Sequence, residues 1–216
     1  GEARALEEKS LALRRKLADK SAIAASLHAL GTFAHEQGDY QPAAALYEEA
    51  LAIRRQLGDA GSIATLLNNM GNLAQAQGNP EQVRALQEES LAIRRKIGDK
   101  AGISQSLNNL AVLAQEQADY NLARTLMEES LAIDRELGNK KGVAVSLRNY
   151  GELMHRQNEF GRALSFYQQS LGLFRELEDK LGITACMEGF AILASVQNQT
   201  DRAVRLFGIA EAMRES

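Results

Sequence analysis

Apolar residues recur along the chain at a short spacing within helices and at a long spacing between copies of one unit. In the first complete copy they are separated by four, three and four residues, at Ile23, Leu27, Leu30 and Ala34. This spacing places them on one face of an α-helix. The same residue types return 40 positions later and again after a further 40, at Ile63, Leu67, Met70 and Ala74 and at Ile103, Leu107, Leu110 and Ala114. The pattern therefore predicts a tandem array of helices.

Turn signals divide this array about every 20 residues. They pair a glycine or alanine with Asp or Asn, at Gly38-Asp39, Gly58-Asp59, Gly78-Asn79, Gly98-Asp99, Ala118-Asp119 and Gly138-Asn139. Glycine suits the left-handed residue that ends a helix, and Asp or Asn caps the helix that follows. Asn79 followed by Pro80 and Glu81 is the clearest helix start. Each unit is therefore predicted to be two antiparallel helices.

The repeats predict one all-α array over residues 1–216. Residues 1–18 align with the second half of a unit, as the orphan second helix of a preceding repeat, and repeats follow at about 19–58, 59–98, 99–138, 139–178 and 179–216. Because the chain starts inside this pattern and without Met, we expect it to be part of a longer protein. A coiled coil is disfavoured because 40 is not a multiple of seven, and a β-propeller because strand and aromatic signatures are missing.

Small and aromatic residues occupy fixed places in each unit. In the first unit they are Leu27, Leu30, Gly31, Ala34, Ala43, Tyr47 and Ala50. These residues resemble the pattern of the tetratricopeptide repeat (TPR) family, W-x2-L-G-x2-Y followed by A-x3-F. The resemblance implies a right-handed α-solenoid, the TPR superhelix, whose first helices line a concave groove and whose helices cross closely at Gly31. HEAT-type repeats share the length but not this placement of small residues.

The repeat is longer than the family's usual 34 residues. Arg55 stands where the family has proline, so each second helix is expected to run about one turn further. This long form is similar to the repeats of kinesin light chains and of bacterial signalling proteins. Residues 201–212 also resemble the tail of arrays in multidomain bacterial regulators. The resemblance implies a cytoplasmic interaction or sensing arm of such a protein.

Composition and motifs narrow the possible functions. The net charge is −3 and the pI is about 5.7, which does not suit a nucleic-acid surface. No apolar run approaches the ~20 residues of a membrane span, and the single Cys186 fits a reducing compartment. His28 and His35 are seven residues apart, which does not suit a metal site on one helix. We expect no metal, no cofactor, no nucleic-acid or membrane partner and no enzymatic activity.

Candidate binding residues come from the groove face that the resemblance implies. Counting about 100° per residue from the buried stripe selects positions rich in carboxamides. The selected set is Asn68, Asn69, Asn72, Gln75, Gln105, Asn108, Asn109, Gln115, Arg148, Asn149 and His155. Carboxamides donate and accept hydrogen bonds together, which suits the backbone of an extended peptide, and similar arrays clamp peptides with such asparagines. The sequence therefore predicts a scaffold for a protein or peptide partner.

Alternatives to this hypothesis stay open. Asn69, Asn109 and Asn149 can instead tie neighbouring helices together. A small effector can bind locally near Arg148 and His155, where Glu152 and Arg156 share the face and Glu188 and Ile192 occupy the corresponding face of the last repeat. The chain can also form a homo-oligomer through the exposed apolar face of residues 1–17.

Overall fold

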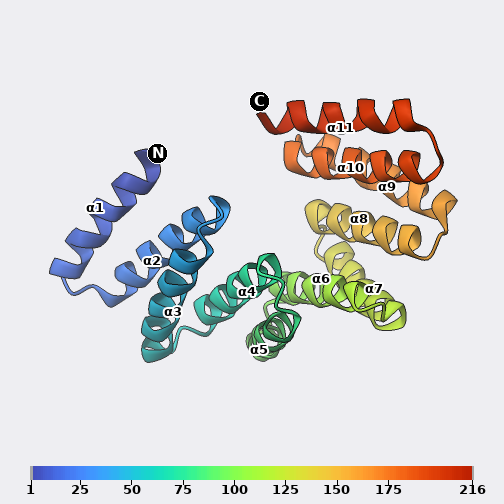
Figure 1. Cartoon of the computed structure of the whole chain (residues 1–216). Coiled ribbons are helices and arrows are strands. Elements are labelled where there is room, and N and C mark those ends of the chain that lie inside the picture. The colour runs from blue at the N-terminus through green and yellow to red at the C-terminus, as the bar shows by residue number, and fades with distance from the viewer. Residues whose placement is uncertain (1, 216) are drawn as a thin grey trace. The chain divides into compact units, whose positions relative to one another are not determined.

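The computed structural model describes residues 2–215, with side chains from 3 to 214. These residues form eleven α-helices and no strand (Figure 1). The helices are α1 Glu2–Lys16, α2 Lys20–Glu36, α3 Tyr40–Leu57, α4 Ala60–Ala76, α5 Pro80–Ile97, α6 Lys100–Glu116, α7 Tyr120–Glu136, α8 Lys140–Arg156, α9 Phe160–Glu176, α10 Lys180–Val196 and α11 Thr200–Glu215. The predicted ends of the array, Gly1 and Ser216, lie outside the described residues.

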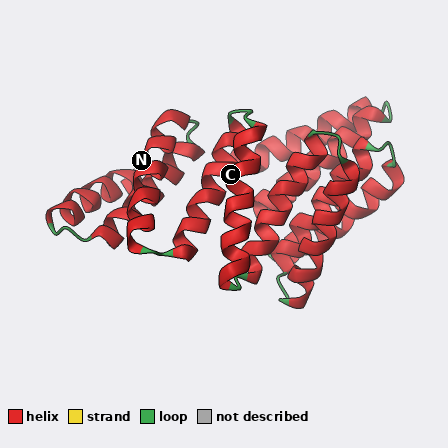
Figure 2. Cartoon of the chain, turned by 90° about the horizontal axis from the view of Figure 1, so that it is seen from below, coloured by secondary structure: helices red, strands yellow, loops and turns green. Residues whose placement is uncertain are grey.

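The chain forms two compact units, Gly1–Leu113 (unit 1) and Ala114–Ser216 (unit 2). In unit 1, α2 packs on α3 and α4 on α5; in unit 2, α8 packs on α9 and α10 on α11. Short loops join consecutive helices (Figure 2), so partners within a pair run antiparallel. The predicted all-α solenoid of antiparallel helix pairs is therefore confirmed.

Helix ends follow the turn signals of the sequence. Asn79 accepts a hydrogen bond from the Gln82 backbone N–H at 3.1 Å, and Pro80 opens α5, as predicted. Gly58 ends α3 in the left-handed conformation with φ of 68°. Asp39 is an exception, because it makes no side-chain cap and its carboxylate lies 3.7 Å from the Arg4 guanidinium.

Close helix crossings depend on glycines that face large side chains. A Cβ added at Gly31 would stand 2.7 Å from the Tyr47 ring, so the crossing expected at Gly31 is present. Gly151 and Tyr167 repeat this contact in unit 2, also at 2.7 Å. The two tyrosines occupy the same repeat position, and both rings are buried.

Joints between successive pairs differ from one repeat to the next. In unit 1, the buried Arg94 donates to the Gly102 carbonyl at 2.7 Å and to Ser106 Oγ at 2.9 Å. Such hydrogen bonds compensate the loss of water around a buried charge. At the same repeat position in unit 2, Phe174 packs against Gly182. The backbone pattern is thus constant while the chemistry of the joints varies.

Candidate functional site

Asparagines in unit 1 connect the first helices of neighbouring pairs. Asn69 on α4 donates its Nδ2 hydrogen to His28 Nε2 on α2, at 2.7 Å. Asn109 on α6 donates to Asn68 Oδ1 at 3.0 Å and to Asn72 Oδ1 at 3.1 Å, both on α4. We call Asn69, Asn109 and their three acceptors the amide ladder. Its two donors, Asn69 and Asn109, which we call the rungs, occupy the same repeat position, 40 residues apart.

The ladder changes the interpretation of the predicted groove residues. Four of the predicted residues are buried, namely Asn68, Asn108, Gln115 and Asn149. Five are half-buried, namely Asn69, Gln75, Asn109, Arg148 and His155, and Asn72 and Gln105 are exposed. Gln105 Oε1 accepts a hydrogen bond from Arg94 at 3.1 Å. The role in tying helices together, which the sequence left open, is present for Asn69 and Asn109. These contacts do not test peptide binding.

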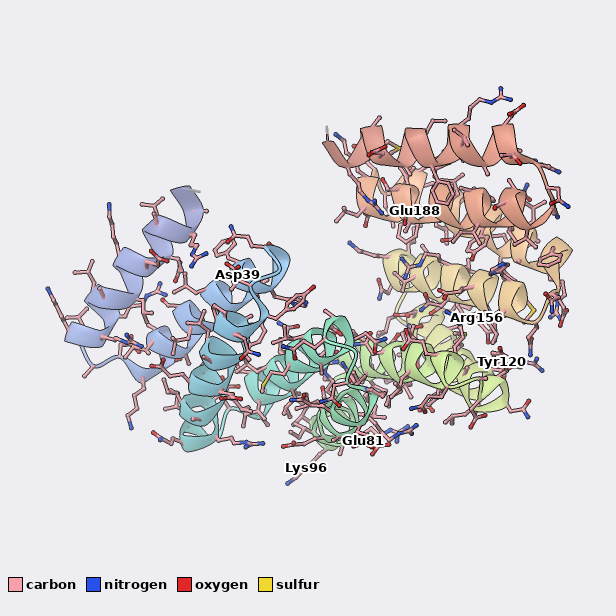
Figure 3. All side chains as sticks on the ribbon, in the orientation of Figure 1. Asp39, Glu81, Lys96, Tyr120, Arg156 and Glu188 are labelled. Carbon is pink, nitrogen blue, oxygen red and sulfur yellow. The ribbon has the colours of Figure 1, made fainter. Side chains whose placement is uncertain are left out.

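Unit 2 contains a pocket with a volume of about 510 Å³. Its lining comes from α8 (Arg148, Glu152, His155 and Arg156), α9 (Tyr167) and α10 (Ala185, Glu188, Gly189 and Ile192). Figure 3 labels two of these lining residues, Arg156 on α8 and Glu188 on α10. Arg148 and His155, the two residues singled out for a local effector site, are both in this lining.

Gly189 explains why space exists at this joint. It occupies the repeat position of Asn69 and Asn109 but has no side chain with which to form a rung. The ring of Tyr167 lies against it instead, since a Cβ added at Gly189 would stand 2.7 Å from Tyr167 Cζ. Tyr167 also makes an edge contact with Phe190, with ring centroids 5.8 Å apart. The ring is thereby fixed between α8 and α10.

The charges of the lining are unevenly compensated. Glu152 forms an ion pair with Arg156 at 2.9 Å, and Glu188 forms one with Arg214 on α11. Arg148 instead donates to the neutral amide of Asn149 at 3.1 Å. Among the lining cations, Arg148 is therefore the one that has a neutral partner in the structure described for residues 3–214.

The Tyr167 hydroxyl is a hydrogen-bond donor at neutral pH. Burial raises the pKa of this phenol above its ordinary value, and the Glu152 carboxylate adds to the rise. Within residues 3–214 the structure gives the hydroxyl no hydrogen-bond partner. The equivalent Tyr47 hydroxyl donates to Thr32 Oγ1 at 3.3 Å. The lining of the pocket thus includes an available neutral donor, Tyr167, and a cation, Arg148.

Neither a metal site nor a membrane span emerges from the side chains that the structure describes. No group of three or more His, Cys, Asp or Glu residues among them is arranged to hold a metal ion. In the same part of the chain, no helix has the length and apolar character needed to cross a bilayer. The site has to be understood from carboxamides, arginine and tyrosine.

Stacked helix pairs of this length, in which a second helix packs on the first helix of the next pair, as α3 does on α4 and α9 on α10, define a helical-repeat solenoid. The chain belongs to the tetratricopeptide repeat family, which it matches over residues 1–56, 62–136 and 102–176. This membership supports a general role as a protein-interaction scaffold in a family that is generally non-catalytic. Helices α10 and α11 lie beyond the matched segments. A search of curated proteins gives no match.

Solved structures share the fold. BtubC (BKLC) from P. vanneervenii is 19% identical with a TM-score of 0.74, over 98% of this chain and 89% of that one. The TPR-like repeats of a putative kinesin light chain from Podosopora anserina are 19% identical with a TM-score of 0.61, over 90% of this chain and 96% of that one. Aspartyl phosphate phosphatase F from Bacillus subtilis is 12% identical with a TM-score of 0.71, over 95% of this chain and 54% of that one. The predicted similarity to kinesin light chain repeats is confirmed for the fold.

The sequence predicts the α8 side of the pocket and part of its α10 side, but not its centre. The groove face predicted for the last repeat includes Glu188 and Ile192, and it leaves out Tyr167 and Gly189. Tyr167 comes from a second helix, which the groove hypothesis left out. The change from asparagine at 69, 109 and 149 to glycine at 189 is the signal that marks this position.

Proposed function

We propose that this chain is a scaffold that binds an extended peptide segment of a protein partner along the first-helix face of unit 1. The observation that supports the proposal is the amide ladder. Asn72 is exposed, and its Oδ1 accepts a hydrogen bond from Asn109, which orients the amide. Its Nδ2 hydrogens are then directed to other acceptors, such as a peptide carbonyl. A preorganised donor loses less conformational freedom on binding than a mobile one.

This mode of binding recognises backbone rather than side chains. A carboxamide contacts the C=O and N–H groups that every peptide has. We therefore expect the bound sequences to vary in their side chains. Bacterial signalling, a cytoplasmic setting and a parent regulator remain hypotheses from the resemblance.

The test begins with peptides selected from a random display library against the whole chain. Their affinity is then measured by fluorescence anisotropy for the native chain, for Asn72→Ala and for Gln41→Ala, a matched exposed amide on α3. We expect Asn72→Ala to weaken binding about five- to tenfold, since one hydrogen bond contributes about 1 kcal/mol. Gln41→Ala should have no effect. Buried Asn68 and Asn108 are poorer targets, because their loss also changes stability.

A peptide with its central amides N-methylated provides the second measurement. It should bind more weakly than the parent peptide, whereas alanine substitution of single side chains should matter less. The proposal is wrong if no library peptide binds, or if selected peptides bind native chain and Asn72→Ala equally well.

Self-association through α1 remains a second proposal. Leu6 and Leu13 are exposed on this helix, at 66% and 61%, and Leu17, directly after it, is 79% exposed. Burying such side chains against a neighbouring copy is favourable. Light scattering of the native chain and of the Leu6→Glu/Leu13→Glu variant tests this, because a mass that stays the same in both would contradict it.

A further inference from the structure

We propose that the pocket of unit 2 binds a small ligand made of one carboxylate and an apolar body. This site lies on α8, α9 and α10 and is independent of the peptide proposal for α4 and α6. Its volume of about 510 Å³ falls in the range of ligand pockets, roughly 300–1,000 Å³. The three arguments that follow concern charge, hydrogen bonding and the apolar wall.

Charge balance selects an anion. The two acidic side chains of the lining are already neutralised, Glu152 by Arg156 and Glu188 by Arg214. Arg148, half-buried and bonded to a neutral amide, leaves a positive charge at the pocket. Partial burial strengthens its attraction for an anion compared with a fully exposed arginine.

Charge balance also selects a single negative charge. A guanidinium matches the planar geometry of a carboxylate and can donate two parallel hydrogen bonds. Because Arg148 is the single uncompensated charge among the lining residues that the structure describes, it balances one negative charge, and a doubly charged phosphate would bring a second one without a partner. We therefore assign a monoanionic carboxylate rather than a phosphate.

Tyr167 supplies the second donor. Its residue is 5% exposed, it lines the pocket, and its hydroxyl makes no hydrogen bond to any described side chain. A phenol hydroxyl can donate a hydrogen bond to an acceptor in the pocket. A carboxylate held by Arg148 has a second oxygen that can accept it.

The remaining wall fits the apolar body. Ala185, Gly189 and Ile192 form it along α10. Ile192 is 42% exposed, so a ligand that covers it removes apolar surface from water. An amphipathic ligand therefore satisfies both sides of the pocket, whereas an inorganic anion leaves the apolar wall exposed.

The same carboxylate chemistry can come from a free metabolite-sized acid or from the C-terminus of a peptide. Isothermal titration of the whole chain with 3-phenylpropanoate, 3-phenylpropanamide and 3-phenylpropyl phosphate tests the chemistry. Titration with the tripeptide Gly-Gly-Phe, with a free or amidated C-terminus, tests the source. Tighter binding of the free acid than of the free-ended tripeptide identifies a small effector, and the reverse order identifies a peptide end.

We expect 3-phenylpropanoate to bind with a dissociation constant of about 1 mM or tighter, as suits a small fragment. Its amide should bind roughly tenfold or more weakly, because the charge-assisted hydrogen bond is lost. Arg148→Gln should cause a similar loss, and Tyr167→Phe a smaller one of about threefold to tenfold. Arg175→Gln, an exposed arginine on α9, is the matched control and should bind normally.

Ile192→Glu guards against variants that fail to fold. The position is exposed, so circular dichroism should stay unchanged while carboxylate binding is lost through repulsion. The inference is overturned by equal binding of acid and amide, by preference for the phosphate, by no binding of any carboxylate, or by normal binding to Arg148→Gln.

Discussion

Two sites 120 residues apart in the sequence share one backbone arrangement and differ in what fills it. At the α2–α4 joint of unit 1, His28, Tyr47 and Asn69 are connected by hydrogen bonds or ring contacts to neighbouring side chains. At the α8–α10 joint of unit 2, the corresponding residues are Arg148, Tyr167 and Gly189, and a pocket is present.

The difference shows how a repeat array acquires a site without changing its fold. Asn69 donates a hydrogen bond to His28, while Gly189 has no side chain that could contact Arg148 in the same way. The tyrosine is common to both joints, so it does not explain the difference between them. The difference comes from glycine in place of asparagine and from arginine in place of histidine.

Gly189→Asn should have the largest effect, because it attempts to restore the rung. The new Cβ would stand 2.7 Å from Tyr167 Cζ, so the ring or α10 has to move. We expect a loss of about 1–3 kcal/mol in the free energy of unfolding, measured with urea. A double-mutant cycle with Tyr167→Leu should show a coupling of about 1 kcal/mol, since leucine lacks the interfering atoms. Strict additivity would mean that the ring is not the obstacle.

Asn69→Ala tests the filled joint. It removes the hydrogen bond to His28 Nε2 and should lower the free energy of unfolding by about 1 kcal/mol. The matched control is Asn121→Ala, an exposed asparagine on α7, for which we expect less than about 0.5 kcal/mol. Equal effects at the two positions in urea unfolding would contradict a stabilising rung.

Tyrosine-to-phenylalanine exchanges compare the two hydroxyls directly. Tyr47→Phe removes the hydrogen bond to Thr32 and should cost about 0.5–1 kcal/mol. Tyr167→Phe removes a hydroxyl that has no partner in the described part of the chain and should cost close to nothing. Thermal unfolding followed by circular dichroism measures both, and the reverse ranking would refute the assignment of an unpartnered Tyr167.

The pH dependence of the filled joint should be the smallest effect, because His28 remains partly accessible. Burial, with the nearby positive charge of Arg54, lowers the pKa of His28 below 6.5 in the folded state. The unfolded state therefore binds the proton first as pH falls below about 6.5, and the folded state loses stability towards the lower folded pKa. In His28→Asn, the urea midpoint of unfolding should change less between pH 7 and pH 5 than in the native chain. An equal change of the midpoint with pH in both proteins would contradict the shifted pKa.

Much of the fold follows from local sequence signals. The spacing of Ile23, Leu27 and Leu30 locates a helix face, and Asn79 with Pro80 locates a helix start, because both depend on residues close together in the chain. The cap expected at Asp39 is wrong in detail. Its carboxylate faces Arg4, a residue on a helix 35 positions earlier that local patterns do not bring into view.

The site was less predictable because it depends on neighbours. Counting angles around one helix placed Asn68 and Asn108 beside the buried stripe, yet they are only 1% and 6% exposed. In a stacked array, first helices on either side cover more of the surface than an isolated helix suggests, as the Asn109 contact to Asn68 shows. Predicting the pocket also requires noticing that the side chain present at Asn69 and Asn109 is missing at Gly189.

The rung position also matters for protein engineering and for how duplicated repeats can diverge in sequence. Each rung joins side chains of adjacent repeats and makes no demand on more distant ones. A joint can therefore be emptied or filled by changing one residue per copy, as Asn69 and Gly189 illustrate. In an array with this design each joint between repeats can be changed by itself. Lengthening the array by whole repeats adds new joints and leaves the existing ones as they were.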